Sequence, residues 1–423
     1  MTPARSTATD RAWTLQDAER WLLELELFGM TFGLERMRRL MTALGSPQRG
    51  YRTIHVVGSN GKSSTTRMIA AILQRHGLRT GAYLSPHLVS FAERVRVDDH
   101  DLAPADFAEA GRRACRAAAA VDRTLTAGER VTQFEALTAA AYLALREAGV
   151  EVAAIEAGLG GRFDATNVID SEVQVLTGVG LEHSRWLGPT IADIADEKAD
   201  VVRPGGTLVV GSDLAPEART VAERVCAERG ARIVTAPPVD VAIAAEGPFQ
   251  RRNFALARAA AEALLGDLDD NAVADAAAST LVPGRFEIVA NRPVTVFDGA
   301  HNPDGVRALA DALRGFLDGR RLVCCFAVLD DKDAAAMLGE LAPLCDEFVF
   351  TAATNPRALP PATLLSLSRQ IGGPPARVVS GPHAALAAAR ELAGPDGVAL
   401  ATGTLYLLAD LLRDPDAPRG STL

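Results

Sequence analysis

IHVVGSNGKSS, residues 54–64, joins an apolar run to two glycines and a lysine, an order that is typical of a phosphate-binding loop between a strand and a helix. Gly58 and Gly61 let backbone N–H groups turn toward an anion, and Lys62 adds a positive charge. The usual spacing requires a glycine where this chain has Val56, so a plain strand–turn–helix with an exposed lysine stays open as the alternative. The predicted nucleotide contacts in this loop are Gly58, Ser59, Asn60, Gly61, Lys62, Ser63 and Ser64.

The composition predicts a globular protein of two or three domains. The chain has 423 residues, of which 48% are hydrophobic and 23% charged, and its net charge of -9 excludes a nucleic-acid backbone as a natural partner. No apolar stretch reaches the ~20 residues that span a bilayer, and the first ten residues lack the apolar segment of a signal peptide. We therefore expect a cytoplasmic protein without a membrane partner. Its five cysteines show no CxxC spacing, and we interpret them as reduced structural thiols.

Continuous apolar runs alternate with helical patterns and predict an α/β fold with two doubly wound domains. Such runs suit parallel strands that are covered on both faces. We expect helices over 64–75 and 132–147. The N-terminal domain is expected over 1–289, with a helical segment over 1–50, the hinge at 289–293 and a smaller Rossmann-like domain over 294–423. The expected strands are 53–58, 79–85, 151–158, 173–180, 206–211 and 231–236, then 294–299, 321–329, 347–352, 376–381 and 397–403.

Polar side chains follow several of the expected strands of the first domain. Ser85, Glu156 and His183 each come at or just after a strand end, where open α/β sheets bind ligands. Two oxygen donors and an imidazole beside a phosphate loop suit Mg²⁺ shared with ATP. Each has an alternative: Ser85 as a turn residue before Pro86, and His183 as a loop histidine with a local partner. Glu156 has the strongest case as a ligand, because burying a carboxylate without a partner costs free energy.

Lys198 lies on an apolar stripe of the helix expected in TIADIADEKADVV, residues 190–202. Ile191, Ile194, Lys198 and Val201 follow one another at spacings of three and four. From this pattern alone we expect Lys198 to extend its amine into solvent along the helix surface.

Ten motifs in fixed order resemble the folylpolyglutamate synthase/dihydrofolate synthase family of the Mur ligase superfamily. The motif IEAGLGGRFDATNVID, residues 155–170, is the most specific of them. The others are HVVGSNGKSSTT (55–66), LSPHLVSFAERVRV (84–97), TQFEALTAAAYLAL (132–145), GLEHSRWLGPTIADIADEKADVVRPG (180–205), PGRFEIV (283–289), FDGAHNPDG (297–305), VLDDKD (328–333), NPRALPPATL (355–364) and TGTLYLL (402–408).

The resemblance implies a role for residues in both domains. It makes Ser85, Glu156 and His183 metal ligands and gives Lys198 a carbamate, so that Lys62, Lys198 and His183 are the expected catalytic residues. It implies ATP contacts through Asn253, Arg285 and Asp298, of which the last lies in the second domain. Pterin or folate contacts are implied for Thr132, Gln133, Phe134, Glu135, Arg162, Phe163 and Asp164, and glutamate contacts for His301 and Thr404.

The implied reaction is an ATP-dependent amide ligation in folate biosynthesis and one-carbon metabolism. The γ-phosphate would activate the carboxylate of dihydropteroate or a folate, and L-glutamate would then attack the acyl phosphate. The implied cations are Mg²⁺ at two sites, with K⁺ as a further candidate, and a monomer is expected. A Mur-type ligase that acts on a non-folate acid and a nucleotide-binding protein without catalysis remain the alternatives.

Several positions depart from the family pattern. Ser59 and Ser63 replace the usual Thr and Gly of the loop, and Glu182 replaces the Asp before the histidine. Thr404 replaces a Ser and keeps the hydroxyl. Asp200 replaces a Gly, and its charge would disfavour a carbamate on Lys198 if it pointed inward.

Overall fold

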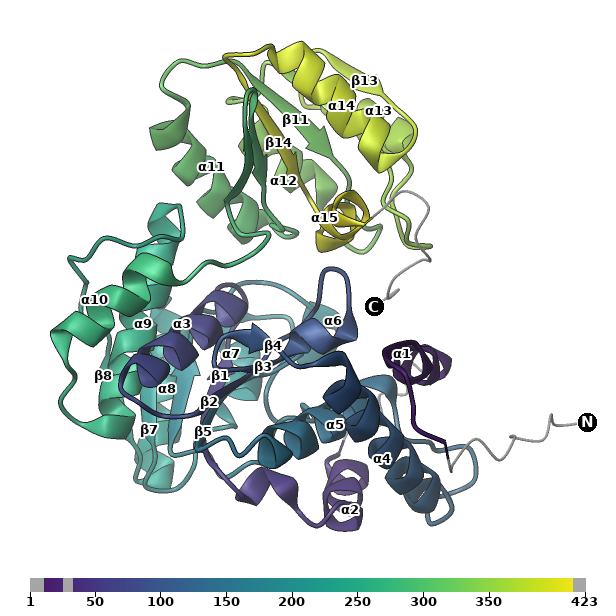
Figure 1. Cartoon of the computed structure of the whole chain (residues 1–423). Helices are drawn as coiled ribbons and strands as arrows, with labels where there is room; N and C mark the ends of the chain where they lie inside the picture. Colours follow the sequence, from purple (N-terminus) through teal and green to yellow (C-terminus); the bar gives the residue numbers. More distant parts are fainter. Residues whose placement is uncertain (1–10, 26–32, 414–423) are drawn as a thin grey trace, which may run out of the picture. The chain divides into compact units, whose positions relative to one another are not determined.

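The computed structural model describes residues 11–25 and 33–413 (Figure 1). The chain forms two compact units, the first over residues 11–25, 33–237 and 255–276 and the second over 238–254 and 277–413. Within the described residues, no helix combines the length and the apolar character that crossing a membrane requires. The first ten residues, which the sequence analysis used to judge a signal peptide, lie outside the described part.

An eight-stranded sheet organises the first unit. Its inner strands pair in parallel, while the hairpin at one edge is antiparallel, so the sheet is mixed. In spatial order the strands are β4 (His100–Asp101), β3 (Val95–Val97), β2 (Thr80–Tyr83), β5 (Val152–Glu156), β1 (Arg52–Val57), β6 (Val173–Leu176), β7 (Thr207–Val210) and β8 (Arg232–Thr235).

Helices cover both faces of this sheet, as a doubly wound fold requires. Thr80 and Ala82 of β2 face α3 (Lys62–Arg75), whereas a side chain at Gly81 would meet Leu145 of α5 (Gln133–Glu147) at 2.7 Å. On the α5 face, α7 (Ile191–Ala199) and α8 (Pro216–Arg229) pack on β1, β6 and β7 through a cluster that includes Val57 and Leu176.

The remaining helices of the first unit continue these layers (Figure 1). The helices near the N-terminus pack with α5 in one apolar cluster that also contains Tyr83 and Ile155. These elements are α1 (Leu15–Glu24), α2 (Glu35–Ala43), η1 (Pro47–Arg49), η2 (Phe91–Arg94), α4 (Pro104–Asp122) and α6 (Ser184–Leu187). Later in the chain, α9 (Pro248–Leu265) begins in the second unit and ends in the first, and α10 (Asp270–Ser279) begins in the first and ends in the second.

A six-stranded sheet organises the second unit. Its strands, in spatial order, are β13 (Ala376–Val378), β12 (Glu347–Phe350), β11 (Leu322–Phe326), β14 (Val398–Thr402), β10 (Val294–Phe297) and β9 (Glu287–Asn291). Only β9 runs antiparallel to its neighbour among these described strands. The helices are α11 (Pro303–Leu317), α12 (Ala334–Leu341), α13 (Pro361–Gln370), α14 (Pro382–Ala393) and α15 (Leu405–Leu412).

The two-sheet α/β fold predicted from the sequence is confirmed, and all eleven expected strands are present. The β3–β4 hairpin and β9 were not predicted from the sequence. The interval 289–293, where we placed a hinge, lies in the β9–β10 hairpin of the second sheet, and its role as a hinge stays a prediction.

Candidate functional site

The phosphate-loop sequence forms a tight connection between β1 and α3. Gly58 and Gly61 adopt φ values of +147° and +85°, a region that side chains disfavour. A Cβ at Gly58 would lie 2.0 Å from the hydroxyl oxygen of Thr177, so this position requires a glycine. The same hydroxyl donates to the Asn60 carbonyl oxygen at 2.6 Å and ties the loop to the residue after β6. Thr177 was not predicted from the sequence, although its place after a strand end was a usable signal.

Two lysines donate to one carbonyl oxygen of this loop. The Lys62 Nζ donates to the carbonyl oxygens of Gly58 and Ser59, each at 3.0 Å, and the Lys198 Nζ donates to that of Gly58 at 2.8 Å. Lys198 is 1% exposed, so the expectation that its amine reaches solvent is wrong. The reason is that α7 packs its apolar stripe directly on the sheet, which carries the lysine to the end of β1.

The surroundings of Lys198 lower the pKa of its amine. Burial lowers the pKa of the Lys198 amine to about 8, and the charge of Lys62 lowers it as well. The Glu182 carboxylate, with Oε1 at 3.6 Å from the amine, opposes this shift. The lysine is thus set between one cation and one anion in a dry environment.

Asp200 points away from Lys198. Its carboxylate accepts from the Arg229 Nη2 at 2.5 Å and lies 3.7 Å from the Arg162 Nε. The replacement of the family's glycine by Asp200 therefore does not place a carboxylate against the lysine amine.

Glu156 joins the phosphate loop to the end of β2. Its carboxylate is 1% exposed, and it accepts from the Ser63 hydroxyl at 2.9 Å and from the Ser85 N–H at 3.0 Å. Register explains the meeting, because Glu156 pairs with Val56 and faces the side of the sheet that α3 covers. Ser63, where the family has glycine, thus adds a hydroxyl beside the predicted metal ligands Ser85 and Glu156.

His183 lies at the start of α6 and is largely exposed. Its backbone is left-handed, with φ of +50°, and its carbonyl oxygen accepts from the Trp186 N–H at 2.8 Å. Among the described residues, no three His, Cys, Asp or Glu side chains gather closely enough to bind a metal by themselves. The structure thus brings Ser85 and Glu156 together, while the role of His183 stays a prediction.

The Thr132–Glu135 segment begins α5. Thr132 and Glu135 form a capping box, with the Glu135 carboxylate accepting from the Thr132 N–H at 2.9 Å. Both Glu135 oxygens also accept from the Arg36 Nε at 3.1 Å in a buried ion pair. Gln133 donates to the Leu22 carbonyl oxygen at 2.7 Å. Three of the predicted substrate contacts, Thr132, Gln133 and Glu135, therefore have hydrogen-bond partners within the protein. No signal in the sequence indicated that Arg36 is the partner of Glu135.

Phe134 and the turn after β5 lie against one another. A Cβ at Gly158 would come within 2.5 Å of the Phe134 ring, so the glycine allows this close approach. Farther along the turn, Phe163 is 43% exposed. Asp164 is buried, which raises the pKa of its carboxyl group, and it accepts from the backbone N–H groups of Leu159 and Thr166.

In the second unit, Asp298 is buried at the end of β10. Its carboxylate accepts from the N–H groups of Phe286 and Ala300, both at 2.8 Å. Burial raises the pKa of Asp298, and the nearby charge of Arg285 opposes the shift. A Cβ at Gly299 would lie 2.2 Å from the Arg285 Nη1, so the guanidinium lies across the backbone beside Asp298.

The other predicted residues of the second unit are Asn253, His301 and Thr404. Asn253 is on α9, and its side-chain amide donates to the Gln250 Oε1 at 2.9 Å. The His301 Nδ1 lies 2.9 Å from the Gly299 carbonyl oxygen. The Thr404 hydroxyl caps α15 by accepting from the Tyr406 N–H. Because the Gly403 N–H donates to the Ala300 carbonyl oxygen, the segments that carry His301 and Thr404 run beside each other.

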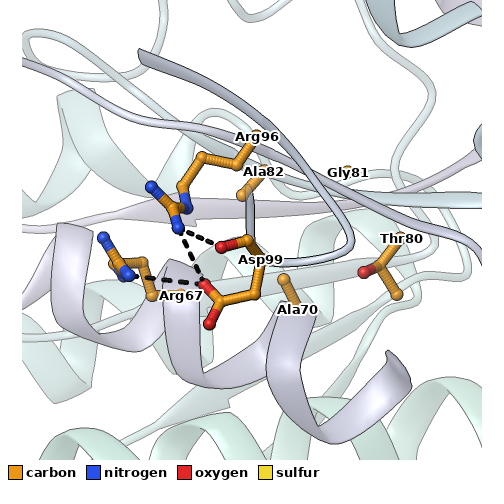
Figure 2. Close-up of a pocket in the computed structure, with 7 residues that line it drawn as sticks. All are labelled: Arg67, Ala70, Thr80, Gly81, Ala82, Arg96 and Asp99. Carbon is orange, nitrogen blue, oxygen red and sulfur yellow. Dashed lines mark hydrogen bonds and ion pairs between the residues drawn. The ribbon is translucent and has the colours of Figure 1, made fainter. Parts of the chain in front are cut away.

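A hollow between α3 and β2 is separate from these residues. Figure 2 shows Asp99 accepting from both guanidinium groups of the hollow, those of Arg67 and Arg96, at 3.3 and 3.2 Å. The hollow lies beside the first three residues of β2, whereas Ser85 comes after Tyr83, the last residue of that strand. The lining residues are Arg67, Ala70, Thr80, Gly81, Ala82, Arg96 and Asp99.

Comparisons with known proteins agree with this architecture. The family described as "Mur ligase, glutamate ligase domain" matches residues 284–405. The dihydrofolate synthase/folylpolyglutamate synthase of Mycobacterium tuberculosis is 35% identical over 381 residues, which cover 81% of this chain and 78% of that protein. The chain belongs to the folylpolyglutamate synthase/dihydrofolate synthase family.

Other members of the folylpolyglutamate synthase/dihydrofolate synthase family differ in length. A probable bifunctional folylpolyglutamate synthase/dihydropteroate synthase of Haloferax volcanii is 35% identical over 93% of this chain, but the chain spans only 50% of it. A bifunctional enzyme of the family from Yersinia pestis, solved with AMPPNP and a Mn ion, matches with a TM-score of 0.82 and 28% identity, and the match covers 94% of this chain and 97% of that one. The family predicted from the sequence motifs is thus confirmed.

Proposed function

We propose that this protein is an ATP-dependent ligase that joins L-glutamate to dihydropteroate, to a reduced folate, or to both. One observation carries the proposal: in a chain of this family, the phosphate-loop lysine and a buried second lysine share the Gly58 carbonyl oxygen. ATP, the acid and L-glutamate are the proposed small-molecule partners.

The residues around Glu156 fit a divalent cation. A buried carboxylate next to the hydroxyl of Ser63 and the end of β2 at Ser85 supplies hard oxygen donors, which Mg²⁺ prefers. We assign Ser85 and Glu156 as ligands, with His183 and a carbamate on Lys198 completing two sites. The Yersinia pestis relative with AMPPNP and Mn supports a nucleotide and a divalent cation in this role. When bound, the cations supply charge neutralisation for the phosphates.

The chain's own residues act mainly by position and charge. The N-terminus of α3 and the loop N–H groups would face the phosphates, and Lys62 would leave its two carbonyl partners to neutralise the transferred phosphate. Attack of the substrate carboxylate on the γ-phosphorus forms a mixed acyl phosphate and ADP. The neutral amine of glutamate then attacks the acyl carbon, and phosphate leaves with the former carboxylate oxygen.

The second unit supplies the proposed contacts to nucleotide and glutamate. Asp298 and the guanidinium of Arg285 place opposite charges near each other at the end of β10, an arrangement suited to a ribose and phosphates. His301 and Thr404 lie on adjacent segments within the range that matches the glutamate ligase domain, which supports their assignment to the incoming glutamate.

ADP release measured with separate acids tests the proposed function. The purified chain receives ATP, Mg²⁺ and L-glutamate with dihydropteroate, with tetrahydrofolate, or with no acid. We expect ADP release that requires a pterin acid and glutamate together, and a product heavier by one glutamyl residue. Turnover with an unrelated acid alone would contradict the folate assignment, and nucleotide binding without turnover would indicate a protein that has lost catalysis.

A further inference from the structure

The turn after β5 is fastened to the last turn of α7. The Arg162 N–H donates to the Glu197 carbonyl oxygen at 2.9 Å. At Gly161 a Cβ would meet the carbonyl oxygens of Glu197 and Lys198, both at 2.8 Å, so glycine permits backbone-to-backbone contact beside the buried lysine. The turn therefore links the strand that ends at Glu156 to the helix that carries Lys198.

The Arg162 side chain strengthens this link. Its Nη1 donates to the Glu197 Oε1 at 2.6 Å and its Nη2 to the Asp196 Oδ2 at 2.7 Å. The Asp200 carboxylate lies 3.7 Å from its Nε, so one guanidinium faces three carboxylates from α7 and the residue after it. A planar fork that engages two partners at once holds direction as well as distance.

Hydrogen bonds within the turn hold its shape. Asp164 accepts from the Leu159 N–H at 2.8 Å, and Asn167 donates to the Arg162 carbonyl oxygen at 3.1 Å. Because Arg162 belongs to this turn, a movement of α7 away from the turn would break the Arg162 contacts.

We infer that Arg162 is a positioning residue, which sets the place of Lys198 relative to Glu156 through Asp196 and Glu197, and does not contact the pterin substrate. This replaces the substrate-binding role that the family resemblance implied for Arg162. The measurement of kcat and KM rests on the proposed function. The measurement of amide hydrogen exchange in α7 does not depend on activity.

The kinetic experiment compares Arg162→Gln and Arg162→Lys with Arg224→Gln as the matched control. Arg224 of α8 also binds Asp196, but through Oδ1, whereas Arg162 binds Oδ2. We expect Arg162→Gln to lower kcat by about 10- to 100-fold with KM values for ATP and the pterin acid within about twofold, since misplacement of a catalytic group lowers the rate without loss of substrate contacts. Arg162→Lys should recover part of kcat, and Arg224→Gln should stay near wild type.

A second variant approaches the contact from the other side. Glu197→Gln should lower kcat in the same direction, and the double variant with Arg162→Gln should cost less than the product of the two single effects. Amide hydrogen exchange should become faster across residues 195–199 in Arg162→Gln and Glu197→Gln and stay unchanged in Arg224→Gln. If one of the two single variants is too unstable for kinetics, the other variant and its amide hydrogen exchange still test the contact.

Two results would overturn the inference. One is a raised KM for the pterin acid with unchanged kcat in Arg162→Gln, which would make the arginine a substrate contact. The other is unchanged exchange in α7 together with unchanged kinetics. A wild-type chain without turnover on any pterin acid would contradict the proposed function instead, and the exchange measurement would still decide the positioning role.

Discussion

The state of Lys198 gives the most quantitative prediction of the structure. A carbamate forms only on a neutral amine, and with a pKa of about 8 roughly a tenth of the Lys198 amine is neutral at pH 7. A lysine with the ordinary value of 10.5 would be neutral in only about one molecule in 3,000. Burial and the neighbouring Lys62 thus raise the reactive fraction by roughly two orders of magnitude, and we predict that Lys198 takes up CO₂ at neutral pH.

The chain is well suited to a direct assay, because it contains only three lysines, Lys62, Lys198 and Lys332. The protein is equilibrated with ¹³C-labelled bicarbonate, Mg²⁺ and ADP between pH 7 and 8, and the carbamate carbonyl carbon is observed by ¹³C NMR. We expect one slowly exchanging signal that Lys198→Arg removes and Lys332→Arg retains. The α-amino group, with an ordinary pKa of about 8, gives a second signal that all variants share.

The lowered pKa of the Lys198 amine sets how the amount of carbamate changes with pH. The neutral fraction of Lys198 increases as the pH rises toward 8, so at a fixed bicarbonate concentration the equilibrium amount of carbamate should be larger at pH 8 than at pH 7. The reasoning would be refuted if Lys198→Arg kept every carbamate signal of the wild type, or if the wild type showed only the α-amino signal while it was fully active.

Three further substitutions test contacts of the site and its support. Ser63→Gly should lower the free energy of unfolding by about 1–3 kcal/mol in urea titration, because buried Glu156 loses a donor, while Ser63→Thr should not; equal stability of all three proteins would contradict this. Thr177→Val should raise the KM for ATP about fivefold by freeing Asn60 of the loop, with Thr177→Ser as the control, and an unchanged KM would count against the anchor. Arg36→Met should lower the free energy of unfolding by about 3–5 kcal/mol, because it leaves the Glu135 carboxylate buried and unpaired. Arg39→Met breaks an exposed ion pair with Glu35 and should lower it by less than about 0.5 kcal/mol. Similar losses in the two variants would contradict this difference.

The strands could be predicted because parallel strands buried on both faces are continuous apolar runs. The β3–β4 hairpin lacks that signal, since its strands are short and carry Arg96 and His100. Its turn also lacks a glycine, although Asp98 and Asp99 adopt φ values of +50° and +60°. The β9–β10 hairpin was interpreted as a hinge because the alternation of strands and helices breaks there and then restarts.

The candidate site could be predicted only as far as strand ends reveal it. The loop, Ser85 and Glu156 follow strands, and the sheet register brings them together. Lys198 was expected in solvent, because a helical stripe shows which face is apolar but not where a long side chain ends. Neither the direction of Asp200 nor the Arg36–Glu135 pair, which joins residues 99 apart, is encoded in local spacing.

The central claim is that ATP activates a pterin carboxylate as an acyl phosphate before glutamate attacks. Transfer of ¹⁸O tests it most directly: dihydropteroate labelled in both carboxylate oxygens is converted with ATP and L-glutamate, and the released phosphate is analysed by mass spectrometry. The account predicts one ¹⁸O atom in each inorganic phosphate and the other in the new amide. Phosphate free of ¹⁸O, formed in step with the glutamylated product, would contradict it.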